Sequence, residues 1–256
     1  MEKHFIEVNN ASYTYDAGSE DALQAVKRMN FTVAPGEHLA VLGRNGSGKS
    51  TMARLLNALL LPQQGRVLVL GRDTADEENV WPIRSDLGMV FQNPDNQIVG
   101  TTVEEDVAFG PENLGVPRDE MLKIVPAALE KVSLTGFEKR QPSELSGGQK
   151  QKLAVAGILA MQPACIILDE ATAMLDPRSR RELLDLVTSL QEEQQLTLIN
   201  VTHHMDEVLR ADRVLVMSHG EKVLEGTPAE VFYEGEHIKR LGLDVPAYVS
   251  LTRTIA

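Results

Sequence analysis

The chain has 256 residues, of which 43% are hydrophobic and 24% are charged, and its formal net charge is −12. That length is ample for a buried core, and the negative charge argues against a broad nucleic-acid interface. The single cysteine cannot form an internal disulfide, and the first residues lack the pattern of a secretory signal, which predicts a cytoplasmic protein. Because no apolar run approaches the roughly 18–20 residues that span a bilayer, work at a membrane would need a partner chain.

Short segments of alternating apolar and polar residues fill positions 4–33 and predict an antiparallel β layer. Tyr15 lies in this layer, upstream of a glycine-rich loop that begins at Gly43. A tyrosine at a strand end can stack on an adenine face, although most strand tyrosines serve packing. The sequence alone does not decide between adenine stacking and packing for Tyr15.

The segment Gly43–Thr51 fits the phosphate-loop pattern G-x-x-x-x-G-K-[ST] at every fixed position. A short apolar strand, His38–Leu42, precedes it. Apolar residues at helical spacing predict an amphipathic helix that extends to Leu60 and is ended by Pro62. This strand–loop–helix context favours a true phosphate loop over a glycine-rich turn that only joins two elements.

Two side chains of this loop add ligand contacts to those of its backbone N–H groups. Consecutive N–H groups at the loop and the helix start suit a polyphosphate. The Lys49 ammonium would contact the β- and γ-phosphates, and the Ser50 hydroxyl is placed to hold Mg²⁺.

Residues 87–91 predict a strand, and residues 92–97 form a polar loop rich in amides. Loop amides usually serve turns and caps. Gln92, however, directly follows a core-type strand, where the ligand sites of α/β folds gather. We therefore treat Gln92 as a candidate ligand-sensing residue.

A helical insertion is predicted over residues 93–160. Thr102 and Glu105 have the spacing of a helix capping box. A further helix is predicted over 118–132, which Pro126 should kink or divide.

The second glycine element is Leu145–Gln149, with the sequence Leu-Ser-Gly-Gly-Gln, and it opens a predicted helix over 150–161. A serine followed by glycines at a helix start is an anion-binding geometry, although it is also a common way to begin a helix. Paired with a phosphate loop earlier in the chain, it suggests a nucleotide held from two sides.

Cys165–Leu168 predicts a buried strand that ends in two adjacent carboxylates, Asp169 and Glu170. Adjacent carboxylates repel each other, so such a pair indicates either a nearby cation or a catalytic role. Asp169 fits a partner of Mg²⁺, and Glu170 fits the base that positions an attacking water. The alternative is that both residues cap the following turn. Cys165 is expected to serve core packing.

Two candidates lie further along the chain. Asp176 occupies a tight loop, where a role as N-cap of the helix predicted at 178–194 is at least as favoured as a ligand role. His203 follows the apolar strand 196–201. A histidine at a strand end is often structural, but after the last core strand of a phosphate-loop fold it can reach a γ-phosphate, and we favour that role.

Together these elements predict an α/β fold with a phosphate-loop (RecA-like) core, an N-terminal antiparallel β layer and a helical insertion subdomain. Residues 213–225 add a hairpin. The expected organisation is a single domain, 1–256, with the core and β layer in 1–92 and 161–225, the helical subdomain in 93–160 and a helical tail in 226–256.

The order of these motifs resembles that of the ABC-type ATPases over nearly the whole chain. The Leu-Ser-Gly-Gly-Gln run is the discriminating element, because other phosphate-loop families lack it. Segments 91–97 and 104–113 resemble the cobalt and energy-coupling-factor branch of these ATPases. Segments 57–62 and 169–177 resemble the first of its two ATPase subunit types.

The resemblance implies an ATP hydrolase that uses Mg²⁺ and energises a membrane importer of vitamins or transition-metal ions. The subunit would lie peripherally at the cytoplasmic face of the membrane. Its partners would be a second similar ATPase, a transmembrane coupling subunit and substrate-binding membrane subunits, with no nucleic acid. ATP would lie between two ATPase chains, with the phosphate loop of one facing the signature of the other. The region around Gln92 would dock the membrane partner.

The resemblance also assigns roles to individual residues. Catalytic roles fall on Lys49, Glu170 and His203, and metal contacts on Ser50, Gln92 and Asp169. The nucleotide contacts would come from Tyr15, Gly43, Asn45, Gly46, Ser47, Gly48, Lys49, Ser50, Thr51, Gln92, Ser146, Gly147, Gly148, Gln149 and Asp176. Two departures are Lys152, where the family usually has arginine, and a tail that is short for this branch.

Two other function classes compete with this interpretation. Soluble ABC proteins of translation usually carry two ATPase units, whereas those of DNA maintenance contain a long coiled coil. This chain has one phosphate loop and one signature, and residues 93–160 lack sustained heptads. A non-hydrolysing regulatory subunit is disfavoured because Glu170 and His203 are both present.

Overall fold

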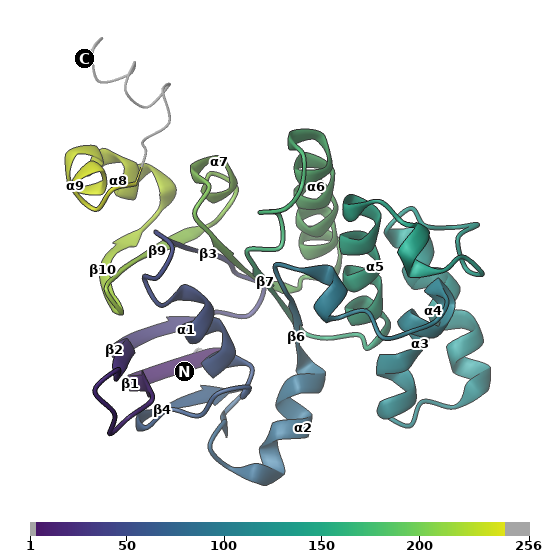
Figure 1. The fold of residues 1–256 in the computed structure, drawn as a ribbon, viewed down its shortest axis with the longest axis horizontal. Helices are drawn as coiled ribbons and strands as arrows, with labels where there is room; N and C mark the ends of the chain where they lie inside the picture. Colours follow the sequence, from purple (N-terminus) through teal and green to yellow (C-terminus); the bar gives the residue numbers. More distant parts are fainter. Residues whose placement is uncertain (1–3, 244–256) are drawn as a thin grey trace. The chain divides into compact units, whose positions relative to one another are not determined.

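The computed structural model describes residues 4–243 (Figure 1). The described residues divide into two compact units, one formed by residues 4–84 together with 197–243 and the other by residues 85–196. The helical subdomain expected over 93–160 falls within the second unit. The fold class expected from the sequence is confirmed, since strands and helices of both predicted kinds are present.

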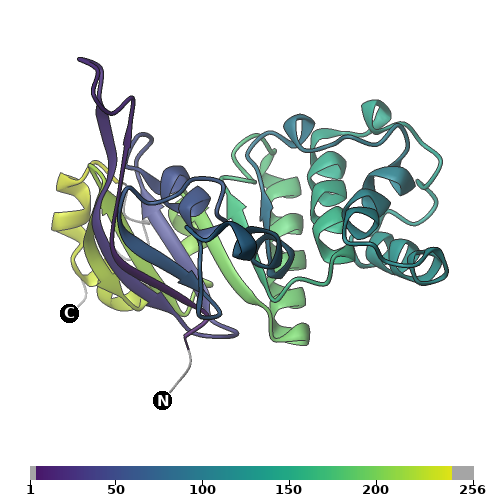
Figure 2. The ribbon, with the colours of Figure 1, turned by 90° about the horizontal axis from the view of Figure 1, so that it is seen from below.

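The first unit contains the predicted antiparallel β layer. Its strands are β1 (Ile6–Tyr15), β2 (Leu23–Val33), β4 (Gln64–Val69) and the short β5 (Arg72–Asp73), in the spatial order β2-β1-β4-β5. The β1–β2 hairpin projects from the rest of its unit (Figure 2).

A second sheet of this unit carries the phosphate loop. Within this unit its strands are β3 (His38–Gly43), β8 (Thr197–Thr202), β9 (Arg213–Ser218) and β10 (Glu221–Gly226), in the order β10-β9-β3-β8. Strands β8 and β9 both run parallel to β3, and every residue of β3 is buried. A strand buried on both faces between parallel neighbours explains the continuous apolar run in the sequence.

Helices complete the first unit. They are α1 (Lys49–Leu56), α2 (Glu77–Asp86), which continues two residues into the second unit, α7 (Met205–Val208), α8 (Pro228–Tyr233) and α9 (Gly235–Arg240). The predicted tail is therefore helical in α8 and α9, and residues 244–256 lie outside the described residues. Val231, Phe232 and Ile238 from α8 and α9 pack into a core cluster with residues of β3 and β9.

Helix α1 ends earlier than its apolar pattern predicts. It stops at Leu56 rather than Leu60, because Ala58 adopts a left-handed backbone conformation with φ 54°. The Arg84 guanidinium donates a hydrogen bond of 3.0 Å to the Ala58 carbonyl, which replaces a helical partner. Leu59 is exposed, so the apolar stripe of α1 is shorter than the sequence indicates.

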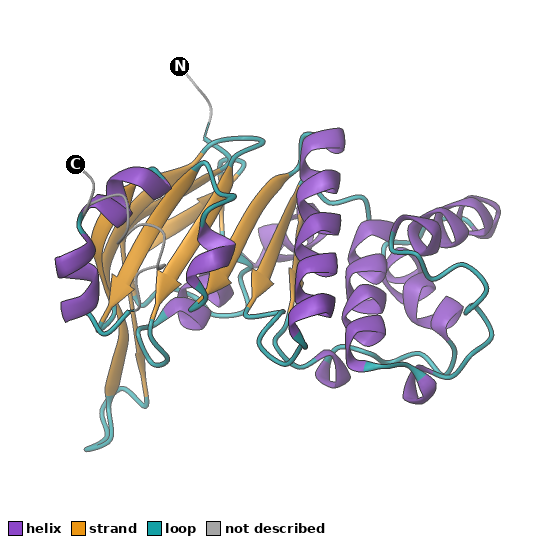
Figure 3. Cartoon of the chain, turned by 90° about the horizontal axis from the view of Figure 1, so that it is seen from above, coloured by secondary structure: helices purple, strands orange, loops and turns teal. Residues whose placement is uncertain are grey.

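The second unit pairs two parallel strands with a group of helices. The strands are β6 (Leu87–Val90) and β7 (Cys165–Asp169). The helices are α3 (Val103–Asn113), α4 (Arg118–Lys131), α5 (Gly147–Ala160) and α6 (Pro177–Gln194), with 3₁₀ turns at Pro94–Asn96 and Pro142–Glu144 (Figure 3). Cys165 is fully buried, and burial raises the pKa of its thiol, which confirms a packing role.

Helix α4 is not divided at Pro126 but runs unbroken from Arg118 to Lys131. Proline removes the hydrogen bond that its N–H would give to the carbonyl four residues earlier, here Leu122. The side chains of Pro126 and Leu122 are both exposed, so water can reach this side of the helix and bond that carbonyl.

Within residues 4–243, no helix is long and apolar enough to cross a membrane.

Candidate functional site

The phosphate loop joins β3 directly to α1 in the first unit. Gly48 is the N-cap of α1, with φ 99°, and the helix begins at Lys49. A Cβ atom at Gly48 would lie 2.1 Å from the Ala25 carbonyl oxygen, and one at Gly43 would lie 2.5 Å from the Met217 carbonyl oxygen. Glycine is required at both positions because the neighbouring atoms are backbone.

Lys49 points back along this loop. Its side chain is buried, with only 3% of the residue exposed, and its Nζ donates a hydrogen bond of 3.1 Å to the Arg44 carbonyl. The Ser47 N–H donates to the same carbonyl oxygen at 3.1 Å. The loop is therefore a closed turn with a cation held at its start, an arrangement that suits phosphate oxygens.

Tyr15 lies close to the same helix. Its hydroxyl and the Thr51 Oγ1 are 3.2 Å apart, within hydrogen-bond distance, and its ring meets Tyr13 edge-on with centroids 4.9 Å apart. The β layer thus reaches the first turn of α1 through Tyr15. Whether the ring also stacks on adenine stays a prediction.

His203 lies just beyond the carboxyl end of β8, at the same edge of the sheet as the phosphate loop. Leu42 of β3 is in parallel register with Thr202 of β8, so Gly43 and His203 both follow the carboxyl ends of neighbouring strands. The His203 and His204 rings lie 4.1 Å apart, and the His204 N–H donates to the Thr202 Oγ1 at 3.0 Å. Ligand sites of parallel α/β sheets lie at such an edge.

The second unit brings three other candidates to one strand edge. Val90 of β6 is in parallel register with Leu168 of β7. Gln92 therefore lies just after β6. Asp169 is the last residue of β7, and Glu170 follows it. Asp169 is buried, whereas Gln92 is exposed.

The backbone of Glu170 is strained. Its φ is 51°, in the left-handed region, which costs a non-glycine residue on the order of 1–2 kcal/mol. Its carbonyl accepts a hydrogen bond of 3.0 Å from the Ala173 N–H, which closes the turn after β7. A strained backbone that the surrounding structure maintains at a strand end is typical of a functional residue whose side chain must keep one orientation.

Gln151 is a residue that the sequence interpretation missed. It is fully buried, and its Nε2 donates hydrogen bonds of 2.9 Å to the Phe91 carbonyl and 2.7 Å to the Ala171 carbonyl. It therefore joins the residue before Gln92 to the residue after Glu170. The available signal was a glutamine among the apolar residues of the predicted helix.

The signature segment forms a reciprocal capping box at the start of α5. The Gln149 N–H donates to the Ser146 Oγ, and the Ser146 N–H donates to the Gln149 Oε1. A Cβ atom at Gly147 would meet no atom within 4 Å, whereas one at Gly148 would lie 2.9 Å from the Ser179 Oγ. The first glycine thus leaves the helix start open, and the second allows close packing against α6.

Ion pairs connect α5 to its neighbours. The Lys150 Nζ lies 2.6 Å from Asp95 in the segment after β6. Lys152, at the position where the resembled family usually has arginine, lies 3.2 Å from Glu182, which also pairs with Arg178 at 2.9 Å. The lysine therefore preserves a charge contact at this position.

Asp176 serves as the N-cap of α6. Its carboxylate accepts hydrogen bonds from the Arg178 N–H at 2.9 Å and from the Ser179 N–H at 3.1 Å. The Ser179 hydroxyl, followed by these N–H groups, holds the pKa of this carboxyl below its usual range. The capping role is confirmed, and a ligand role stays a prediction.

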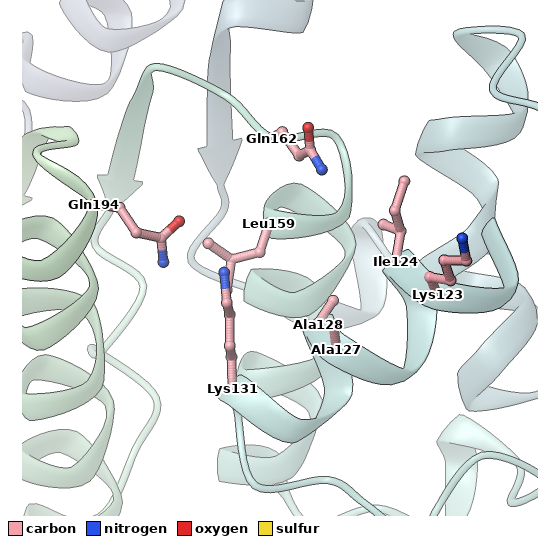
Figure 4. A pocket seen from close by; sticks show the side chains of 8 residues that line it. All are labelled: Lys123, Ile124, Ala127, Ala128, Lys131, Leu159, Gln162 and Gln194. Atoms are coloured by element: carbon pink, nitrogen blue, oxygen red, sulfur yellow. The ribbon is translucent and has the colours of Figure 1, made fainter. Parts of the chain in front are cut away.

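A separate cavity of about 500 Å³ in the second unit contains none of the predicted site residues. Figure 4 shows three of its polar side chains around Leu159 and a fourth, Lys123, on the far side of Ile124. They are Lys123, Lys131, Gln162 and Gln194. We assign no function to it.

The family model described as ABC transporter matches residues 26–173. The chain is 51% identical to the energy-coupling factor transporter ATP-binding protein EcfA1 of Clostridium novyi, over 98% of this chain and 90% of that protein. It is 54% identical to EcfA of Enterococcus faecium, over 94% of this chain and 85% of that protein.

Solved structures agree with these relatives. CbiO1 of Clostridium perfringens, described as part of the ABC transporter complex CbiONQ, superposes with a TM-score of 0.83 at 37% identity, over 98% of this chain and 100% of that one. The ATP-binding cassette MJ0796, solved as a dimer in a post-hydrolysis state with ADP and phosphate, gives a TM-score of 0.78 at 31% identity, over 87% of this chain and 98% of that one. Together with the phosphate loop and the Ser-Gly-Gly-Gln helix start, these matches place the chain among the ABC transporter ATPases, in the branch of the energy-coupling factor ATP-binding proteins.

Proposed function

We propose that this chain binds and hydrolyses ATP, with Lys49, Glu170 and His203 in the catalytic roles. The observation that carries the proposal is the buried Lys49 Nζ, held at the start of a closed phosphate loop by the Arg44 carbonyl. On binding ATP, Lys49 would exchange this carbonyl for phosphate oxygens, and the loop N–H groups would donate to the same phosphates. Tyr15 would complete the contacts to this nucleotide, and the signature residues Ser146–Gln149 would contact ATP bound to the partner chain.

Two side chains would act on the bound triphosphate. Glu170 would accept a hydrogen bond from the attacking water and orient it, and His203 would donate to the γ-phosphate. The strained φ of Glu170, 51°, supports a fixed orientation for its carboxylate.

The residues proposed for Mg²⁺ fit that ion chemically. They are a hydroxyl at a helix start (Ser50), an amide (Gln92) and a buried carboxylate (Asp169). Mg²⁺ prefers oxygen ligands and keeps several waters, so three such groups suffice. Among residues 4–243 there is no cluster of three or more histidine, cysteine or acidic side chains that could hold a metal alone. When bound, Mg²⁺ would neutralise charge on the phosphates.

The partners proposed for the chain are a second, similar ATPase and membrane subunits. The support is the likeness to CbiO1, described as part of a complex, and to proteins named as energy-coupling factor transporter components. In such an assembly the chain would lie peripherally at the cytoplasmic face, and ATP hydrolysis would drive import of a vitamin or a transition-metal ion.

Two variants test the hydrolytic proposal. Glu170→Gln should keep ATP binding and slow hydrolysis by roughly 10²–10⁴-fold, the usual contribution of a positioned base. Lys49→Ala should instead weaken nucleotide binding itself. Binding and turnover are measured separately on both purified variants, assembled with the companion chains that copurify from native membranes. Near-normal turnover of Glu170→Gln would remove Glu170 from the mechanism.

A further inference from the structure

One peptide bond of the phosphate loop joins an asparagine to a glycine. Asn45 is the only asparagine in the chain that a glycine follows, and both residues are exposed. Asparagine is a thermally labile residue type. Its side-chain amide and the backbone nitrogen of the next residue can react within one segment of chain, without a bimolecular encounter. Glycine favours this reaction because it has no Cβ to shield its nitrogen.

The loop places Asn45 and Gly46 at the centre of a turn. The Ser47 N–H donates a hydrogen bond of 3.1 Å to the Arg44 carbonyl, which closes the turn over residues 44–47. Gly46 has φ 80°, and a Cβ atom built there would meet no atom within 4 Å. The space around Gly46 is therefore open, so the peptide unit between the two residues has room to rotate.

Hydrogen bonds restrain neither of the two groups that would react. Loop asparagines commonly bond to nearby backbone, as Asn93 does when its Oδ1 accepts from the Asp95 N–H at 3.0 Å. Within residues 4–243, neither the Asn45 amide nor the Gly46 N–H has such a partner. The amide carbon and the nitrogen that would attack it are both available.

We propose that Asn45 is a site of spontaneous deamidation and that the deamidated loop binds ATP poorly. The Gly46 nitrogen, having given its proton to water, forms a bond to the side-chain amide carbon of Asn45. The bond from that carbon to the amide nitrogen breaks, and ammonia leaves. Water then opens the resulting cyclic imide at one of its two carbonyls. One opening gives aspartate, and the other gives isoaspartate, whose main chain runs through the former side chain.

Either product changes the charge of the loop. A carboxylate replaces a neutral amide next to Arg44, whose carbonyl holds the Lys49 Nζ. This carboxylate would attract the ammonium and repel the phosphates of ATP. Isoaspartate also adds a carbon atom to the main chain, which displaces the N–H groups of the loop. The loss of ATP affinity rests on the proposed function, whereas the deamidation itself does not.

The test incubates the full chain without nucleotide at physiological temperature and mildly alkaline pH. Peptide mass spectrometry follows the gain of about 1 Da at each asparagine, and enzymatic methylation of isoaspartate identifies the second product. The internal control is Asn113, which is also exposed but precedes Leu114, whose N–H donates to the Gly110 carbonyl at 3.2 Å. Asn45 should convert about tenfold faster than Asn113 or more.

A second incubation, in guanidinium chloride, gives the rate for the unfolded chain. Because the loop leaves both reacting groups unrestrained, the folded chain should convert at Asn45 within about tenfold of that rate. This comparison separates the geometry of the loop from the Asn-Gly sequence alone.

ATP affinity before and after the incubation is the functional readout. The fraction of chains that lose binding should equal the fraction converted at Asn45. Asn45→Asp, one of the two products, should bind ATP about tenfold more weakly or worse from the start. Asn45→Gln is the matched control, because its longer side chain can close only a larger, less favourable ring. It should keep its own starting affinity throughout the incubation.

Three results would overturn the proposal. They are conversion of Asn45 no faster than that of Asn113, conversion much more than about tenfold slower in the folded than in the unfolded chain, and unchanged ATP affinity of converted chains. A fresh chain that does not bind ATP would instead refute the proposed function, and the peptide masses would still decide whether Asn45 deamidates.

Discussion

Gln151 holds two backbone carbonyls that flank the proposed reaction residues, at Phe91 and Ala171. Replacing it by leucine removes the donor from both carbonyls, and at the buried bond to Ala171 this costs about 1–3 kcal/mol of stability. We predict that Gln151→Leu lowers kcat by about tenfold or more and changes KM for ATP little, because the loops bearing Gln92 and Glu170 lose their common anchor.

Separate measurement of kcat and KM checks this prediction, with thermal unfolding to follow stability. Gln141→Leu makes the same chemical change at an exposed position and should leave both constants unchanged. A Gln151→Leu protein that is less stable but turns over normally would make Gln151 a purely structural residue.

His38 should make stability depend on pH. It is buried at the start of β3, and burial lowers its pKa from 6.5 to about 4, with Asp212 opposing and Arg210 adding a smaller unfavourable charge. Between these two values the unfolded chain binds more protons than the folded chain. The contribution of neutral His38 is therefore complete above pH 6.5 and is lost as the pH falls toward 4, by about 2 kcal/mol at pH 5.

Urea unfolding at pH 7 and pH 5 measures this loss. In His38→Gln the residue no longer titrates, so the fall in unfolding free energy between the two pH values should be smaller by that amount. An equal fall in both proteins would assign the pH dependence to other groups.

The local structures that could be predicted from the sequence are those defined by short spacings. The phosphate loop, the carboxylates after β7 and the Asp176 cap follow from patterns within a few positions. Gln151 could not be found in that way, because its partner Phe91 lies 60 residues away. The left-handed backbone of Glu170 is likewise set by packing, since no local rule places a glutamate there.

At the scale of single elements, helix starts were easier to predict than helix ends. The Thr102–Glu105 capping box is present, and Ser146 with Gln149 forms another. The early end of α1 depends on a hydrogen bond from Arg84, which lies 26 residues beyond Ala58. Such a bond is a tertiary contact, so the spacing of apolar residues along the sequence cannot predict it.

The segment 93–109 is our proposed docking surface for the membrane coupling subunit. Two of its apolar side chains are exposed, Val99 at 59% and Phe109 at 50%, and exposed apolar groups close together in sequence mark interaction sites. Its Asp95 forms an ion pair with Lys150 at the start of α5. Movement of this segment can therefore reach the signature helix through a direct contact.

We predict that Val99→Ser/Phe109→Ser abolishes coupling to the membrane subunits and leaves the ATPase activity of the isolated pair unchanged. Apolar positions are preferred to Glu104 for this test, because Glu104 pairs with Lys139 and its reversal would also break that contact. Leu122→Ser on α4 is the control, since Leu122 is 67% exposed but lies outside the segment. Assembly and transport in reconstituted vesicles are the measurements, and unchanged values in the double variant would refute the docking role.

At the scale of the whole molecule, the predicted nucleotide residues are divided between both units. The phosphate loop, Tyr15 and His203 belong to the first unit, whereas the carboxylates Asp169 and Glu170 and the signature belong to the second. The order of motifs along the chain was enough to predict the fold class. The extent of the second unit, 85–196, was not evident from the sequence, because the contacts of β6 and α6 with helix α5, and the pairing of β7 with β6, form only in the folded chain.

The signature should act on ATP bound to a partner chain. The Ser146–Gln149 capping box satisfies backbone groups at the start of α5 but leaves the Ser146 hydroxyl proton free to donate to a phosphate. A second chain can present this helix start to the γ-phosphate without folding its insertion back over its own nucleotide. The relative MJ0796 is described as a dimer with ADP and phosphate, which supports such pairing.

A mixing experiment tests this arrangement. Gly147→Asp is the better signature variant, because a side chain there meets open space, whereas one at Gly148 would press on Ser179 and disturb α6. When Gly147→Asp chains are mixed with Lys49→Ala chains, a signature acting between chains leaves one whole site in every mixed dimer. Random pairing makes half of the dimers mixed, so up to about a quarter of the unaltered turnover should return.

If the signature acts within its own chain, both sites of every mixed dimer are broken and no activity returns. Where the chain pairs only with an unlike ATPase, the same variants are placed across that pair. Gly147→Asp in this chain should then disable the partner's ATP site, while this chain's own Lys49 site still binds nucleotide. Nucleotide trapping at each of the two sites distinguishes the cases, and loss confined to this chain's own site would exclude action between chains.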